Sequence, residues 1–284
     1  MAKLQLFSEL LKQFNNLTNF AILIKWYYVN KIVKAKKYLG QHFLTDEAIA
    51  QRIVKSLLHQ QNVLEIGSGM GILTKYLLSN ANINQLKAVE IDKESISYLQ
   101  THYPNLNVYN EDFLQTNLAS FFESNISIIG NFPYNISNQI LFKVFDNRDR
   151  VTEVVGMFQK EVAERIAAKE GCKAYGILSV LLSAFYDIEY LFSVNEEVFF
   201  PPPKVKSAVI RMVRNDVRSL PCNEKLFVKI VKTAFNQRRK MLRSSLKPLQ
   251  TDLTTIKPEY STLRAEQLSV NQFITITQTL EQQL

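Results

Sequence analysis

Short apolar runs alternate with longer amphipathic stretches across the middle of the chain, between residues 62 and 214. Helical periodicity fills most of the gaps between these runs, as in residues 160–169. Continuous apolar strands separated by helices are typical of a largely parallel, doubly wound α/β sheet. We expect the last two strands, which are closely spaced, to form an antiparallel hairpin at one edge. The seven predicted strands are residues 62–67, 86–91, 107–112, 127–132, 151–158, 187–194 and 207–213.

The hydrophobic period becomes helical after Pro221. Apolar residues then recur every three or four positions, and we predict one continuous helix over about 224–246. A later helix is expected to begin near Ser269, because Gln272 stands three residues further on and completes a capping box. Residues 219–284 are therefore predicted to form a small all-helical domain.

Positive charge is concentrated in two segments of the chain. The formal net charge is +8, yet residues 1–37 carry +6 and residues 219–247 carry +7, so the remainder sums to −5. This distribution is compatible with a polyanionic partner and, equally, with a merely solvated basic surface. Basic side chains on the predicted helix recur every three to four residues and are expected to share one RNA-binding face. These residues are Lys225, Lys229, Lys232, Arg238, Arg239, Lys240 and Arg243.

Cysteine content and hydropathy exclude several classes of protein. Cys172 and Cys222 have no metal-ligand spacing, so we expect neither a disulfide framework nor a metal site. The apolar stretch at 20–29 is too short to span a bilayer, contains Lys25, and is not followed by a small-residue cleavage site. We therefore expect a cytoplasmic monomer with no membrane partner.

A glycine-rich turn follows the first predicted strand. The segment VLEIGSGMGILT places Glu65 two residues before the series Gly67-x-Gly69-x-Gly71, and a helix is predicted to follow. Glycines let the backbone turn sharply and approach a ligand closely. The spacing is one residue tighter than the usual dinucleotide fingerprint, and the preceding acid is typical of methyltransferases. We predict that this turn binds S-adenosylmethionine.

Acidic residues stand at the ends of the next two predicted strands. Glu90 ends the second strand, and its carboxylate can accept hydrogen bonds from both ribose hydroxyls of a nucleoside cofactor. Asp92 is expected instead to cap the helix that begins at Lys93. Asp112 ends the third strand, where we expect it to accept from the amino group of the cofactor adenine. Ligands bind at the carboxyl ends of such strands, which favours a cofactor site over unrelated surface acids.

The most specific motif is GNFPYNIS at 130–137, after the fourth predicted strand. Asn131, Pro133 and Tyr134 match the N-x-P-Y pattern of amino-group methyltransferases. The amino nitrogen of adenine is a poor nucleophile because its lone pair is delocalised into the ring. The Asn131 side-chain oxygen and the Pro133 carbonyl can each accept one amino hydrogen, which aims the lone pair at a sulfonium methyl group. Tyr134 offers a stacking face for an extruded base.

A proline-rich loop lies between the last two predicted strands, in VFFPPPKVKSAVI at 198–210. The prolines stiffen this loop. We predict that Phe199 stacks on the other face of the target base. Phe200 is expected to have a structural role, with its ring filling apolar space beside the rigid turn.

From about residue 33 to its end, the sequence resembles the 16S ribosomal RNA adenine dimethyltransferase family, the kasugamycin-sensitivity methyltransferases. The matching segments, besides the glycine turn and NFPYNIS, are KKYLGQHFLTD, MFQKEVAERI, FFPPPKVKSAVI and AFNQRRKMLRSSL. The resemblance implies a Rossmann-like, seven-stranded class I methyltransferase domain over 33–218, followed by the small helical domain. The atypical residues 1–32 are assigned no function.

The resemblance also implies a reaction and further contacts. It implies dimethylation of two adjacent adenosines near the 3′ end of 16S rRNA in the small ribosomal subunit, with S-adenosylmethionine as the methyl donor. It implies that the GQHFL segment lies over the cofactor, with contacts at His42 and Leu44, and that Asn131 borders the cofactor too. The family commonly has Asn where this chain has His42, so the backbone contact is expected to survive the change.

Other functions remain open from the sequence. A 23S rRNA adenine methyltransferase that confers antibiotic resistance would share the glycine turn and the N-x-P-Y motif, but the PPPKV loop and the basic AFNQRRKMLRSSL segment favour the small-subunit enzyme. A DNA adenine methyltransferase is disfavoured because no separate sequence-reading domain is visible. A non-catalytic assembly factor for small subunits is disfavoured by the intact Asn131–Tyr134 motif.

Overall fold

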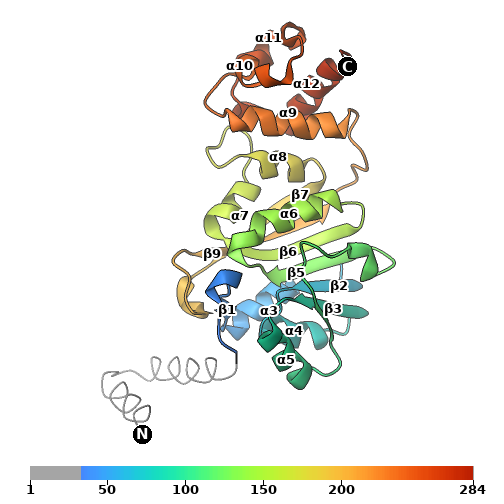
Figure 1. Ribbon diagram of the computed structural model, residues 1–284, viewed down its shortest axis with the longest axis vertical. Helices are drawn as coiled ribbons and strands as arrows, with labels where there is room; N and C mark the ends of the chain where they lie inside the picture. The colour runs from blue at the N-terminus through green and yellow to red at the C-terminus, as the bar shows by residue number, and fades with distance from the viewer. Residues whose placement is uncertain (1–32, 284) are drawn as a thin grey trace, which may run out of the picture.

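A mostly parallel sheet forms the centre of the protein (Figure 1). The structure is a computed structural model and describes residues 33–283. In that part of the chain the main sheet has seven strands in the order β4-β3-β2-β5-β6-β9-β7. The first five of these are parallel, and β9 runs antiparallel to both β6 and β7. The predicted seven-stranded α/β fold and its antiparallel edge pair are therefore confirmed. The strands are β2 (Asn62–Ile66), β3 (Gln85–Glu90), β4 (Asn107–Asn110), β5 (Ile126–Asn131), β6 (Val151–Gln159), β7 (Tyr186–Val194) and β9 (Ser207–Arg214).

Helices cover both faces of this sheet, because successive strand side chains point to opposite faces. Val63 on β2 packs with the helices α3 and α4, whereas Leu64 packs with α6, α7 and α8. A third small cluster joins α5 to β3 and β4. The helices are α3 (Glu47–Lys55), α4 (Ile72–Leu78), α5 (Lys93–His102), α6 (Ser137–Asp146), α7 (Lys160–Ile166) and α8 (Ile177–Ser183).

A short two-stranded ladder holds the start of the described chain against the proline-rich loop. Strand β1 (Phe43–Leu44) pairs antiparallel with β8 (Phe199–Phe200), so that Leu44 faces Phe199. A 3-10 turn, η1 (Lys37–Leu39), precedes β1. We call residues 36–45 the N-terminal strap. The predicted extension at 1–32 lies outside the described residues.

The C-terminal segment is helical, but its first helix is shorter than predicted. Helix α9 (Glu224–Asn236) ends ten residues before the expected end, and the chain turns before α10 (Leu242–Ser245). The prediction of one continuous helix to residue 246 is wrong because tertiary pairing interrupts it. Met241 bridges to Arg264, and the Leu242 amide donates to the carbonyl of Leu263.

The last helices complete this end of the molecule. Helix α11 (Pro258–Ser261) is short, and α12 (Val270–Glu281) begins after the predicted capping box of Ser269 and Gln272. In Figure 1, α9 to α12 stack beyond α8, at the far end from β2 and β3.

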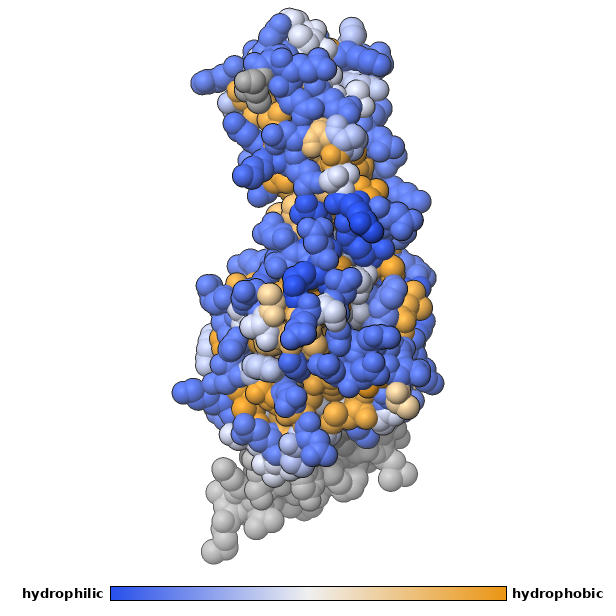
Figure 2. Space-filling view, turned by 90° about the vertical axis from the view of Figure 1, so that its right-hand side faces the viewer, coloured by the Kyte–Doolittle hydropathy of each residue, from blue (hydrophilic) through white to orange (hydrophobic). Residues whose placement is uncertain are grey.

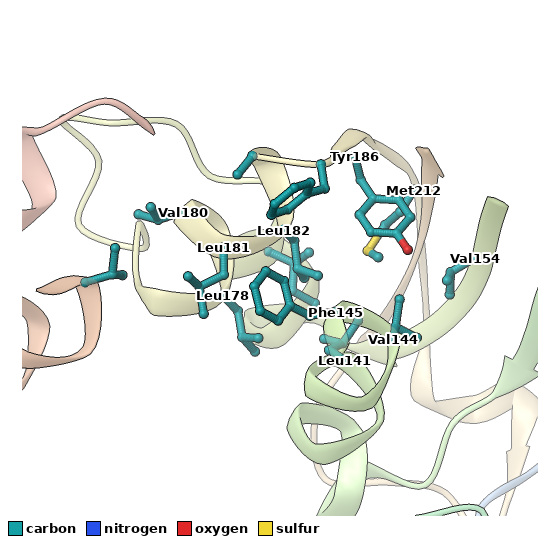
Figure 3. Close-up of a cluster of buried hydrophobic side chains, with 14 of the residues drawn as sticks. Leu141, Val144, Phe145, Val154, Leu178, Val180, Leu181, Leu182, Tyr186 and Met212 are labelled. Carbon is teal, nitrogen blue, oxygen red and sulfur yellow. The ribbon is translucent and has the colours of Figure 1, made fainter. Parts of the chain in front are cut away.

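One hydrophobic cluster connects the sheet to the C-terminal helices through α8. Leu178 and Leu181 on α8 approach Phe145 on α6 (Figure 3), while Phe227 and Ile230 on α9 belong to the same cluster. Because the core is continuous, the boundary at residue 219 stays a prediction.

The surface is mainly hydrophilic in the view of Figure 2, and the most hydrophilic side chains gather at the narrow waist of the molecule. No helix among the described residues is long and apolar enough to cross a membrane.

Candidate active site

A cavity of about 510 Å³ opens where the carboxyl ends of β2, β3 and β5 meet the N-terminal strap. This is the edge at which open α/β sheets bind ligands. Its size is in the range of cofactor pockets. Most of the predicted catalytic and cofactor-binding residues border it: His42, Leu44, Glu65, Gly67, Gly69, Glu90, Asn131, Pro133 and Tyr134.

The glycine turn after β2 has a backbone that only glycine adopts readily. Gly67, Gly69 and Gly71 all have positive φ, at 69°, 54° and 78°. A Cβ on Gly69 would lie 2.9 Å from the Phe43 ring, and one on Gly71 would lie 2.5 Å from the Tyr103 ring. The turn is therefore closely packed on two sides. Gly71 itself is the N-cap residue of α4 and does not border the cavity.

Glu65 ties the glycine turn to α4. Its buried carboxylate accepts a hydrogen bond from the Thr74 hydroxyl at 2.5 Å. Burial raises the pKa of Glu65 to about 7, and the nearby charge of Glu90 adds to the rise. This carboxyl group therefore exchanges its proton near neutral pH.

Glu90 presents a fixed acceptor at the cavity. Its carboxylate accepts hydrogen bonds from the amides of Gly69, Ile91 and Asp92, each at 2.9 Å. Burial raises the pKa of Glu90, and these three hydrogen bonds oppose that rise. Each carboxylate oxygen has two lone pairs, so the group retains one acceptor site, on Oε2, for a ribose hydroxyl. The glycine cradle, this carboxylate and the cavity volume fit a nucleoside cofactor.

Asp92 has the capping role that the sequence predicts, and a second role that it does not. The side chain accepts from the Glu94 amide at 3.3 Å and from the Ser95 hydroxyl at 2.9 Å, at the start of α5. It also accepts from the Lys36 ammonium group and, at 3.2 Å, from the Gln41 amide of the strap. Burial alone would raise the pKa of Asp92, but the hydrogen bonds, that of Lys36 foremost, hold it below its usual value. Asp92 therefore fastens the strap beside the glycine turn.

Asn131 stands at the end of β5 with its amide oriented by the strap. Its Nδ2 donates to the main-chain carbonyl of His42 at 2.8 Å. The carbonyl end of the amide is then the end left to accept hydrogen bonds. The neighbouring Pro133 carbonyl already accepts from the Ile136 amide at 3.2 Å and from the Ser137 hydroxyl at 3.1 Å. A target amino group would share this carbonyl with those two donors.

Tyr134 is half-buried at the wall of the cavity. Its hydroxyl group is hydrogen-bonded to that of Ser207 at the start of β9. Its ring stacks with the His42 ring, with centroids 5.4 Å apart and an interplanar angle of 26°. Burial raises the pKa of Tyr134, so the phenol is neutral and serves as an aromatic surface.

Comparison with known proteins shows the family of this chain. The family model described as ribosomal RNA adenine dimethylase matches residues 32–282. The chain belongs to this family. Membership makes the protein a methyltransferase that uses S-adenosylmethionine, and it confirms the resemblance to 16S rRNA adenine dimethyltransferases.

Curated relatives match over nearly their whole length. A ribosomal RNA small subunit methyltransferase A from Cytophaga hutchinsonii is 58% identical over 253 residues, covering 87% of this chain and 98% of its own. The protein of the same name from Porphyromonas gingivalis is 49% identical over 257 residues, covering 88% of this chain and 99% of its own.

Solved structures share the fold. A dimethyladenosine transferase from Plasmodium falciparum superposes with a TM-score of 0.71 at 26% identity, covering 85% of this chain and 98% of its own. The 23S rRNA methyltransferase ErmE reaches a TM-score of 0.65 at 22% identity, covering 84% of this chain and 99% of its own. The second likeness concerns the fold alone.

Besides Gly71, two residues predicted for the dimethylase site lie outside the cavity wall. Asp112 caps a turn by accepting from the Leu114 amide at 2.9 Å, and it does not border the cavity. Phe199 is only 3% exposed and packs in the core that contains α3, so its ring is not placed to stack on a base. This expectation was wrong because the pairing of β8 with β1 turns Phe199 inward, and Phe200 is the half-exposed ring of the pair.

The basic residues of the dimethylase do not form one helical stripe. Among the predicted RNA-binding residues, Lys225, Lys229 and Lys232 are exposed on α9, whereas Arg239, Lys240 and Arg243 are exposed in the turn and on α10. Arg238 instead donates to the Lys173 carbonyl and lies 3.5 Å from a carboxylate oxygen of Glu266. Two basic groups on adjacent elements therefore replace the predicted single face.

Sequence reasoning missed the contacts that close the cavity. Lys36 and Gln41 on the strap bind Asp92, and Ser207 binds Tyr134. These partners are 51 to 73 positions apart in the chain, and the only sequence signal was that Lys36 and Gln41 belong to the KKYLGQHFL segment. Among the described residues no group of three or more metal-ligating side chains converges.

Proposed function

We propose that this protein dimethylates the amino groups of two adjacent adenosines near the 3′ end of 16S rRNA, in the small ribosomal subunit or its precursor. The observation that carries the proposal is that Asn131 and Tyr134 share one cavity with Glu90 and the glycine turn. The proposed base-binding loop and the proposed nucleoside-binding loop thus line the same cavity. The small-subunit substrate is favoured by the names of relatives at 49–58% identity.

Each side chain of the cavity has a distinct proposed role. Glu90 accepts a hydrogen bond from a ribose hydroxyl, and the glycine turn and Leu44 pack against the cofactor. When bound, S-adenosylmethionine supplies an electrophilic methyl group on its sulfonium. Asn131 accepts a hydrogen of the target amino group through Oδ1, and the Pro133 carbonyl accepts the other. This fixes the nitrogen and directs its lone pair across the cavity.

Tyr134 provides a stacking surface for the extruded adenine in this proposal, since base–aromatic stacking contributes about 1–3 kcal/mol per base. A role for Asp112 in reading the cofactor adenine remains a proposal.

Substrate RNA is proposed to contact the helical segment from residue 219 onward, through Lys225, Lys229 and Lys232 on α9 and through Arg239, Lys240 and Arg243 around α10. Folded RNA is recognised largely by its shape and backbone. Two separate basic groups can therefore each contact phosphates of the same RNA. We also propose that the protein acts as a monomer in the cytoplasm, where its ribosomal substrate is made.

The experiment is transfer of isotopically labelled methyl groups to small subunits that lack these modifications, followed by mass analysis of the nucleosides. Labelled dimethyladenosine in small-subunit RNA is the expected result. Label only in free large-subunit RNA would indicate a 23S rRNA methyltransferase, and cofactor binding without transfer would indicate an assembly factor. Either of those results would reject the proposal.

A further inference from the structure

One residue of the strap, His42, touches the loops on the target side of the cavity. Its Nδ1 lies 2.7 Å from the carbonyl oxygen of Pro201, its ring stacks on Tyr134, and its own carbonyl accepts from Asn131. The adjacent residue, Gln41, bonds to Asp92 on the cofactor side. Of these two consecutive strap residues, Gln41 therefore contacts the cofactor side of the cavity and His42 contacts the target side.

The contact with Pro201 determines the state of the His42 ring. A carbonyl oxygen only accepts hydrogen bonds, so Nδ1 carries the hydrogen and donates. This hydrogen bond and the stacking on Tyr134 hold residue 42 from two directions, between the proline-rich loop and the NFPY loop. The main chain at position 42 is therefore fixed relative to both loops.

The fixed main chain matters because of what it binds. Asn131 can assist a nucleophilic amino group only if Oδ1, and not Nδ2, is turned towards it, since both ends of the amide have nearly the same shape. The hydrogen bond from Nδ2 to the carbonyl of His42 removes this ambiguity. Without a fixed carbonyl at position 42, the Asn131 amide is free to rotate by half a turn. Its Nδ2 group, a hydrogen-bond donor, would then face the target amino group, which is also a donor.

We propose that His42 is a positioning residue for methyl transfer: its side chain anchors the strap so that its carbonyl holds Asn131 with Oδ1 towards the target amino group. This inference rests on the proposed function and differs from the main-chain cofactor contact at position 42 that the family resemblance implies. His42 acts through Asn131 and does not itself exchange a proton with the substrate.

Replacement of the side chain tests the inference. In single-turnover transfer to saturating unmethylated small subunits, His42→Ala is expected to slow methylation by about 10- to 100-fold, the scale of a misplaced catalytic group. Cofactor affinity by calorimetry should stay within about twofold of the parent. His42→Asn should recover most of the rate, because a side-chain amide can also donate to the Pro201 carbonyl. His59→Ala removes the same side chain from an exposed site away from the cavity and serves as the matched control.

A double-mutant cycle with Asn131→Ala separates positioning from a general structural role. If His42 acts through Asn131, His42→Ala causes no further loss once Asn131 is replaced. Equal losses in both backgrounds, a parallel fall in cofactor affinity, or a His42→Ala enzyme with the parental rate would each overturn the inference. All of these comparisons require that the unmutated protein makes dimethyladenosine in small subunits. If the unmutated protein does not methylate small subunits, that result rejects the proposed function and not the role of His42.

Discussion

The carboxylate of Glu90 accepts a hydrogen bond from the main-chain amide of Gly69 at 2.9 Å. This hydrogen bond joins the end of β3 to the glycine turn after β2. Glu90, the proposed ribose acceptor, therefore also fixes the conformation of the turn that we propose packs against the cofactor. Cofactor binding and the conformation of this turn are consequently linked.

Glu90→Ala is expected to weaken S-adenosylmethionine binding. Loss of a charged acceptor typically costs about 1.5–3 kcal/mol, which corresponds to roughly 10- to 150-fold in affinity. Glu90→Gln keeps the shape and one acceptor oxygen, so its loss should be smaller. Isothermal calorimetry on both variants measures the effect, and unchanged affinity in Glu90→Ala would remove the ribose assignment.

The buried carboxyl of Glu65 makes stability depend on pH. Its pKa in the folded protein is about 7, against 4.5 in a model compound, so folding favours the protonated form. Its contribution to the free energy of unfolding is full below about pH 4.5 and is lost as pH rises through 7. Denaturant unfolding at pH 5 and pH 8 should show a loss of up to about 3 kcal/mol that Glu65→Gln lacks. Equal pH dependence in the two proteins would show that Glu65 is not the group responsible.

Phe199→Ala tests the placement of this ring in the core. Truncation of a fully buried phenylalanine typically costs about 3–5 kcal/mol of unfolding free energy, whereas Phe199→Leu should cost clearly less. Chemical denaturation of both variants checks this. A stable Phe199→Ala protein that had lost only methyl transfer would restore Phe199 as a base-stacking residue.

The basic residues around α10 are expected to govern the salt dependence of subunit binding. Replacing Arg239, Lys240 and Arg243 by Gln should weaken binding and lower the slope of log affinity against log salt by roughly 0.7–0.9 for each phosphate that the variant no longer neutralises. Cofactor affinity should not change, because these residues do not border the cavity. The same replacement at Lys225, Lys229 and Lys232 compares the two basic groups directly. An unaltered slope in the first triple variant, with folding intact, would leave α10 as a solvated surface.

The sheet was predictable because most of its strands are local apolar runs whose ends are marked by polar or glycine residues. All seven predicted strands occur, and the capping roles of Asp92 and Ser269 follow from side chains within three residues of the helix start. The glycine turn was predictable for a similar reason, since the residues that readily adopt positive φ can be read directly from the local sequence.

The features that were not predictable depend on contacts between distant segments. The helical period continues past Asn236, but pairing of Met241 with Arg264 ends α9 early. The inward turn of Phe199 requires β1, which comes from the strap. The orientation of the Asn131 amide likewise depends on a carbonyl 89 positions away, at His42. Spacing along the chain carries no information on such pairings.

The central claim is that the Asn131 side chain serves the target amino group in a cavity where other residues bind the cofactor. The most direct test measures cofactor affinity and single-turnover methyl transfer to unmethylated small subunits in the same Asn131→Ala preparation. We predict cofactor affinity within about twofold of the parent, and a transfer rate lower by roughly 100- to 1,000-fold, as for loss of other transition-state hydrogen bonds. A folded variant that transfers methyl groups at the parental rate would contradict the account.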